Sequence, residues 1–144
     1  MSSRPIREII GNQKVVSADS ETTVLEASRL MKQNRIGALL VCRNNRLVGI
    51  FTERDALFRV MAEARDPQTT SLAEVMTSHP QTVDPDKPLG HALHIMYEGG
   101  FRNVPVVENG NPVGIVSARH ALGPELREFE AEMDEREHIQ EILA

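Results

Sequence analysis

Two stretches of the chain decide the fold: Val48-Gly49-Ile50-Phe51-Thr52-Glu53-Arg54-Asp55-Ala56-Leu57 and Val113-Gly114-Ile115-Val116-Ser117-Ala118-Arg119-His120-Ala121-Leu122. They are related by a constant offset of 65 residues, and the correspondence extends without a gap over 15–57 and 80–122. An internal repeat constrains the architecture of a chain before any single residue does. Two copies are too few for a solenoid. We therefore expect two similar halves related by a pseudo-twofold axis, with clefts where they meet.

Each repeat predicts the same order of elements. Apolar residues at the 3.6-residue period predict helices over about 22–34 and 88–98. Short extended segments are expected at 15–16 and 82–83, before these helices. Short buried strands are expected over 38–42 and 104–107, each followed by a hairpin turn and a returning strand over 47–51 and 112–116. Further helices are expected from about 53 and 118. A short helix precedes each repeat, after Pro5 and at a capping box that begins at Ser71.

These elements predict an α+β (α/β) fold of two repeats, each a three-stranded sheet with helices on one face. We place repeat 1 in residues 1–65, repeat 2 in 66–123 and an acidic helix in 124–144. That helix carries a partial apolar stripe, which predicts packing on the body of the protein or across a homodimer. Docking to a separate partner protein is the alternative. The stripe consists of Leu126, Phe129, Met133, Ile139 and Leu143.

Charge and composition limit the classes of function. The net charge is −5, and residues 125–144 alone carry eight acids and two bases, so the rest of the chain sums to +1. A nearly neutral body argues against binding to DNA. No apolar run approaches the ~18 residues of a membrane span, and the start of the chain does not read as a signal peptide. We expect a cytoplasmic protein whose single cysteine, Cys42, is a small buried apolar residue.

The pattern resembles the cystathionine-β-synthase (CBS) domain family in its usual tandem pair, the Bateman module. The resemblance rests on the sequence motif Gly-hydrophobic-x-Thr/Ser-x-x-Asp, where x is any residue. Repeat 1 has this signature complete from Gly49 to Asp55, whereas in repeat 2 His120 replaces the aspartate. The resemblance covers roughly residues 5–122, and its two copies stand at the same place in an ungapped repeat.

The motif has a structural and a ligand-binding interpretation. Thr52 as N-cap and Asp55 three residues later are suited to start a helix. Such a cap contributes about 1 kcal/mol to stability. A helix start also offers free amides to an anion, and a carboxylate suits the two adjacent hydroxyls of a ribose. The resemblance implies that the aspartate binds ribose, that Thr or Ser faces the phosphates, and that adenine lies in an apolar slot of the other repeat. Gly49 would allow close backbone approach.

The resemblance implies one strong site and one weaker site. The strong site combines Thr52, Arg54 and Asp55 with Thr77, Pro80, Gln81, Thr82, Phe101, Arg102 and Asn103. The weaker site combines Ser17, Ile36, Gly37 and Ala38 with Ser117, Arg119 and His120. A neutral histidine has one acceptor, so His120 cannot replace a bidentate carboxylate, and Gly37 stands where the strong site has Arg102. His120 as a cation in contact with phosphate below neutral pH is the alternative.

We expect a regulatory protein that binds AMP, ADP, ATP or S-adenosylmethionine, with or without Mg²⁺, and that forms a homodimer acting on a target protein. A module with vestigial sites and no ligand is the alternative. We expect no enzyme activity, because the sequence contains no nucleophile elbow of a hydrolase, no Walker loop and no glycine fingerprint of a nucleotide-binding fold. His91 and His94 are spaced for a metal, but no third ligand is apparent, and we expect them to face solvent.

Overall fold

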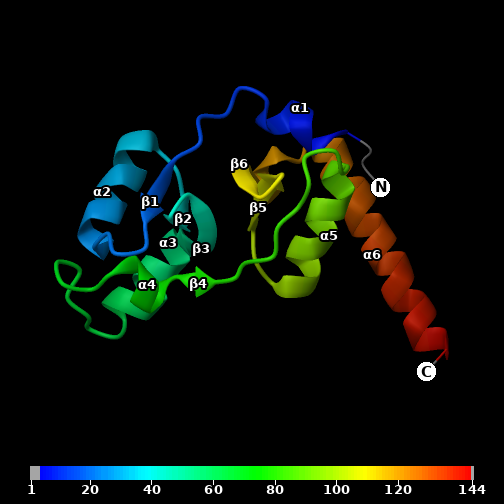
Figure 1. Ribbon diagram of the computed structural model, residues 1–144. Helices are drawn as coiled ribbons and strands as arrows, with labels where there is room; N and C mark the ends of the chain where they lie inside the picture. Colours follow the sequence, from blue (N-terminus) through cyan, green and yellow to red (C-terminus); the bar gives the residue numbers. More distant parts are fainter. Residues whose placement is uncertain (1–3, 144) are drawn as a thin grey trace.

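The chain forms two halves, each with a small sheet and helices packed against it (Figure 1). The computed structural model describes residues 4–143, except the side chains of 123 and 140–143. One half contains β1 (Ser17–Asp19), α2 (Val24–Asn34), β2 (Ala38–Arg43) and β3 (Arg46–Thr52). The other half contains α5 (Leu89–Gly99), β5 (Asn103–Glu108) and β6 (Asn111–Ser117). The mixed α+β class predicted from the sequence is confirmed.

The helices that precede the hairpins begin and end with local signals. Thr23 caps α2 by accepting from the Glu26 amide, and Arg35 ends this helix in the left-handed conformation at φ 54°. The equivalent end of α5 is Gly100 at φ 70°, where glycine has no steric cost. Each helix therefore begins a residue or two later than its apolar period alone predicts.

The two sheets differ, and neither is the three-stranded sheet that the sequence predicts. The first has four strands in the order β1-β2-β3-β4, because the short strand β4 (Thr77–Ser78) from beyond the linker pairs with β3. The second has only β5 and β6. There the equivalent of β1 is reduced to a single parallel bridge between Val83 and Val106. Pro105 lacks the N–H that Leu40 carries at the equivalent position, so this ladder has one donor fewer.

The short helix before each repeat packs on the opposite half. In Figure 1, α1 (Ile6–Ile10) lies beside α5, and α4 (Leu72–Val75) lies beside β3. Equivalent backbone hydrogen bonds hold the two crossings. The Ile6 amide donates to Lys87 O (3.0 Å), and the Leu72 amide donates to Thr22 O (2.9 Å). The two sequence repeats thus exchange their first helices.

The exchange is also visible in the two hydrophobic cores. Ile6 and Ile10 of α1 are buried with residues of α5, β5 and β6. Leu72 and Val75 of α4 are buried with residues of α2, β2 and β3. Each core therefore requires apolar side chains from both sequence repeats, and we expect neither repeat to complete its core alone.

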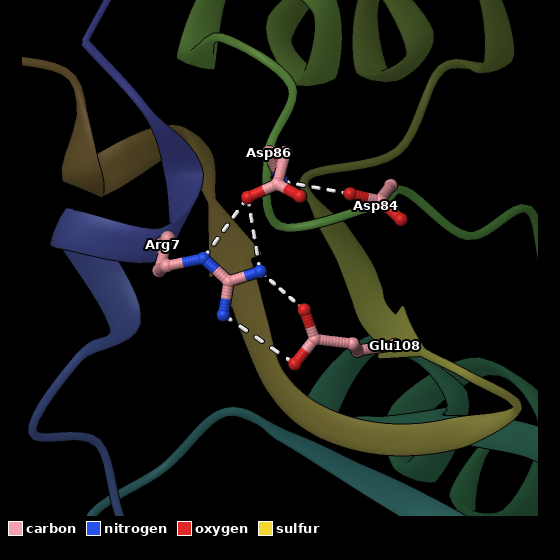
Figure 2. Close-up of polar contacts among 4 residues, drawn as sticks. All are labelled: Arg7, Asp84, Asp86 and Glu108. Carbon is pink, nitrogen blue, oxygen red and sulfur yellow. Dashed lines mark hydrogen bonds and ion pairs between the residues drawn. The ribbon is translucent and has the colours of Figure 1, made fainter.

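A polar cluster on the surface fastens α1 to the second half. Figure 2 shows the Arg7 guanidinium between two carboxylates of that half. Its Nε donates to Asp86 Oδ1 (3.0 Å), and its Nη1 and Nη2 donate to Glu108. Asp86 is itself held in a turn, because its amide donates to Asp84 Oδ1 (2.8 Å). Hydrogen bonding to Arg7 lowers the pKa of Glu108.

The helices that follow the two hairpins are not equivalent. After β3 the chain forms α3 (Glu53–Asp55) and continues as the π-helix η1 (Ala56–Met61). After β6 it forms only the 3₁₀ turn η2 (Ala118–His120), and the long helix α6 (Gly123–Leu143) begins afresh. The helix expected from about 118 is therefore only a 3₁₀ turn. Pro124 has no N–H to continue a preceding helix but is well suited to begin a new one.

The acidic helix α6 packs on the body of its own chain, the first of the alternatives predicted for it. Phe129 and Met133 are buried in the second core. The ring of Phe129 meets Tyr97 of α5 edge to face, with centroids 5.9 Å apart. Leu126 and Ile139 remain exposed, and Leu143 lies outside the described side chains. Within residues 4–143 we find no helix with the length and apolar character of a membrane span.

Candidate functional site

The helix start at Thr52 is a complete capping box. The Asp55 amide donates to Thr52 Oγ1 (3.2 Å), and the Thr52 amide donates to Asp55 Oδ2 (2.9 Å). The Thr52 hydroxyl also donates to Asp55 Oδ2 (3.1 Å). The structural role predicted for both residues is therefore present. The hydroxyl hydrogen is used within the box, so a contact from Thr52 to a phosphate requires its hydroxyl to rotate.

Asp55 is buried, yet its second carboxylate oxygen faces a positive charge. The side chain is 10% exposed, and Oδ1 lies 3.5 Å from Arg59 Nε. Arg59 also donates through Nη1 to Met76 O (3.0 Å) and Val75 O (3.3 Å). A buried carboxylate is stable when it is paired and hydrogen-bonded. Oδ2 already accepts twice from Thr52, so Oδ1 is the oxygen that keeps acceptor capacity for the hydroxyls of a ligand.

Asp55 lines a cleft of about 590 Å³ between the two repeats. The predicted residues of the strong site lie together here, with one exception. Thr82 is exposed and does not line the cleft, because the chain at Gln81 turns away toward the Val83 bridge. The predicted residues that line the cleft are Thr52, Arg54, Asp55, Thr77, Pro80, Gln81, Phe101, Arg102 and Asn103.

The sequence interpretation missed three neighbours on η1. Leu57, Phe58 and Arg59 line the same cleft, and the two apolar side chains are 51% and 56% exposed. Large apolar groups at the mouth of a polar cleft offer a flat surface to an aromatic ring. The sequence held a signal for this: Leu57 and Phe58 are consecutive apolar residues shortly after the aspartate, and their position could have predicted that they line the cleft.

A second cleft of about 500 Å³ lies at the equivalent place in the other repeat. Ile36, Gly37, Ala38, Ser117, Arg119 and His120 line it as predicted, whereas Ser17 does not. Ser17 is exposed on β1 and hydrogen-bonds the Cys42 side chain. Burial raises the pKa of the Cys42 thiol. Lys14 and Gln13 also line this cleft and were not predicted.

His120 takes over the structural half of the aspartate's role. The Ser117 amide donates to His120 Nδ1 (2.9 Å), which requires this nitrogen to be unprotonated. Burial, together with the nearby Arg119 and Arg4, lowers the pKa of His120. In the unliganded protein the surroundings oppose the charge and the cap needs the neutral ring, while a cationic His120 in contact with phosphate below neutral pH stays a prediction.

The two clefts share a wall. Gly37, Glu53, Arg102 and Asn103 line both of them. The loss of a phosphate partner through Gly37 stays a prediction, but Arg102 lines the second cleft as well as the first. Two backbone hydrogen bonds, each within one repeat, explain this position: the Glu53 amide donates to Gly37 O (3.0 Å), and the Ala118 amide donates to Arg102 O (3.0 Å). These bonds bring the start of each hairpin beside the helix start.

Gly49 allows a neighbouring segment of the protein, and not a ligand, to approach closely. It lies outside the residues that line the first cleft. A Cβ at this position would lie 2.4 Å from Met76 Sδ and 3.0 Å from Thr77 O. The expected close approach is therefore that of β4. Gly114 also leaves room for a neighbouring side chain, because its Cβ would lie 2.7 Å from Gln13 Oε1, and that amide hydrogen-bonds both backbone groups of Ile115. Unlike Gly49, it lines the second cleft.

Of the two histidines on α5, His91 is exposed, whereas His94 is half-buried and has partners in the protein. His94 Nε2 lies 2.7 Å from Glu98 Oε1, and its Nδ1 lies 3.4 Å from Arg136 Nη1 of α6. Among the described residues, no three side chains of His, Cys, Asp or Glu are grouped so that they could hold a metal.

Comparison with known proteins identifies the family. The CBS domain model matches residues 6–62 and 72–123. The chain is 36% identical over 104 residues to the CBS domain-containing protein YhcV of Bacillus subtilis, covering 72% of this chain and 74% of that protein. It is 34% identical over 110 residues to CBSCBSPB5 of Arabidopsis thaliana, covering 76% of this chain but only 20% of the plant protein.

A solved structure shares the fold. The hexameric CBS-CP12 protein from bloom-forming cyanobacteria matches with a TM-score of 0.75 and 28% identity, covering 81% of this chain and 65% of that one. The internal repeat, the two clefts at its helix starts and these matches lead to one conclusion. The chain belongs to the CBS domain family and carries two CBS domains in tandem.

Proposed function

We propose that this CBS pair is a regulatory sensor that binds an adenosine nucleotide, or a related adenosyl compound such as S-adenosylmethionine, in the first cleft. The observation that carries the proposal is the Asp55 carboxylate, which stands at a helix start inside a cleft of about 590 Å³. A paired carboxylate with spare acceptor capacity is suited to two adjacent ribose hydroxyls. The same cleft supplies apolar side chains and arginines for the rest of such a ligand.

Each part of the ligand has complementary residues. Leu57, Phe58 and Phe101 offer apolar contact to an adenine ring. Arg54 and Arg102 offer charge-assisted hydrogen bonds to phosphates or to a carboxylate. Glu53 lines the same cleft and repels negative charge, which favours few phosphates or phosphates neutralised by Mg²⁺. We place such a Mg²⁺ on the nucleotide's own phosphates.

We propose that the second cleft is the weaker site. His120 offers no carboxylate to a ribose, and its ring nitrogen Nδ1 already accepts from the Ser117 amide. Lys14, Arg102 and Arg119 still give that cleft a positive lining. A ligand there would be held by its anionic part more than by its sugar.

The readout we propose is regulatory and not catalytic. A ligand can shift the relative position of the repeats only if it binds two arrangements with different affinity. The change would reach a target protein through a homodimer. The exposed apolar residues Leu57, Phe58 and Met61 of η1 support such an interface, and the CBS-CP12 relative is described as a hexamer.

Two measurements test this function. Mass spectrometry of small molecules released from the purified protein is expected to find an adenosyl compound. A thermal-shift screen of AMP, ADP, ATP and S-adenosylmethionine is expected to raise the midpoint by on the order of 10 °C at ~100 Kd for the best ligand. A flat response to all four, with nothing released, would contradict the proposal and favour a structural module with vestigial sites. Turnover of a nucleotide would revive an enzymatic role.

A further inference from the structure

We propose that Arg59 is a positioning residue of the first cleft. It fixes the position of two walls of this cleft, the helix start at Asp55 and the segment that follows α4, relative to each other. This inference rests on the proposed function and adds to it the residue that organises the site. Arg59 is half exposed on η1, four residues beyond the cleft carboxylate. Its guanidinium contacts that carboxylate and also two carbonyls of a segment that comes from the other sequence repeat.

The first wall is the helix start. Asp55 Oδ2 is occupied by Thr52, whereas Oδ1 is 3.5 Å from Arg59 Nε. This ion pair offsets the free-energy cost of burying the carboxylate charge, since the side chain is only 10% exposed. It also keeps Oδ1 from rotating away from the cleft. Without the arginine, the carboxylate would retain its capping contacts on one oxygen only.

The second wall is the segment that follows α4. This helix has only four residues, and Arg59 donates to the carbonyls of Val75 (3.3 Å) and Met76 (3.0 Å) at its end. Carbonyls at a helix C-terminus have no partner within the helix, and a cation there is favourable. The chain then continues into Thr77, Pro80 and Gln81, which line the same cleft as Asp55.

One side chain thus spans the crossing between the two sequence repeats. Loss of Arg59 should release both the ribose acceptor and the segment that faces it. Arg59 acts through Asp55 and α4, so its loss should weaken all adenosine nucleotides by the same factor, whatever their phosphate number. An arginine that touches phosphate would instead give a loss that grows with the number of phosphates.

The test uses the full chain and isothermal titration with AMP, ADP and ATP. Arg59→Met keeps the apolar stem and removes the guanidinium, and we expect about tenfold weaker binding of each nucleotide. The matched control is Arg65→Met, which removes another arginine tie to the same helix, from Arg65 Nη2 to Glu74 Oε1 (2.7 Å), at a place outside the cleft. We expect that variant to stay within about twofold of wild type.

A double-mutant cycle and hydrogen exchange complete the test. If Arg59 acts through Asp55, the Asp55→Asn and Arg59→Met losses are not additive. In the unliganded protein, Arg59→Met should speed exchange of the Met76 and His79 amides, which donate to Leu72 O and Val48 O. Unchanged affinity, a loss that grows with phosphate number, or unchanged exchange would overturn the inference. A wild-type protein that binds none of the three nucleotides and no S-adenosylmethionine would overturn the proposed function, while hydrogen exchange would still decide whether Arg59 holds the two walls together.

Discussion

At the level of single residues, the two helix starts show how one substitution separates a structural role from a binding role. Asp55 and His120 occupy equivalent positions and both accept a hydrogen bond from the amide of the N-cap residue. The aspartate has a second oxygen for a ligand, whereas the histidine has no second acceptor. The sequence alone could predict this difference, because acceptor number follows from residue type.

His120→Asp should therefore keep the cap intact at low pH and give the second cleft a carboxylate. The lowered pKa of His120 means that the unfolded chain binds the proton first, near pH 6.5, so the wild type loses stability as pH falls below that value. Aspartate at this position keeps its acceptor, and we expect about 1 kcal/mol more stability at pH 5. Denaturant unfolding at pH 5 and pH 8 measures it. A variant with the same pH dependence as wild type would contradict the assignment.

Gly49 makes a prediction of a different kind, because its reason is steric. Gly49→Ala places a Cβ against Met76 and the Thr77 backbone, and we expect a loss of about 1–3 kcal/mol in unfolding free energy. Gly37→Ala is the matched control, since its Cβ meets only the flexible end of Glu53 at 3.1 Å. Urea unfolding of both variants checks this, and equal losses would show that the approach of β4 is not what requires the glycine.

At the level of elements, the hairpins and main helices were predictable because each is coded locally. Asn109-Gly110 marks a turn, and apolar periods mark α2 and α5. The exchange of α1 and α4 was not predictable, because it depends on which core a short apolar helix meets. Arg59 was missed for the same reason: two of its partners are carbonyls of a helix from the other repeat.

The exchange of α1 and α4 between the two halves predicts which half is destabilised when a buried side chain of either helix is truncated. Ile6 and Leu72 are both fully buried, each in the core of the half opposite to its own repeat. We expect Ile6→Ala and Leu72→Ala each to cost about 2–5 kcal/mol. Hydrogen exchange should rise first in β5 and β6 for Ile6→Ala, and in β2 and β3 for Leu72→Ala. The reverse assignment, with each variant loosening its own repeat, would disprove the exchange.

At the level of the whole molecule, the two halves differ in what covers their helices. On the second half, α6 buries Phe129 and Met133. On the first half, Leu57, Phe58 and Met61 stay exposed, with Met61 73% exposed. If the protein is a homodimer, we expect it to form through this face of η1. Met61→Lys should then shift the mass measured by light scattering from dimer to monomer, and an unchanged dimer would place the interface elsewhere.

The central claim is that Asp55 holds the ribose of an adenosyl ligand in the first cleft. Isothermal titration of AMP into the wild type and into Asp55→Ala tests it most directly, with Asp55→Asn as a variant that keeps size and removes charge. We predict saturable binding by the wild type and a loss of about 1.5–3 kcal/mol, more than tenfold in affinity, for Asp55→Ala. An Asp55→Ala protein that folds and binds AMP as tightly as the wild type would contradict the account.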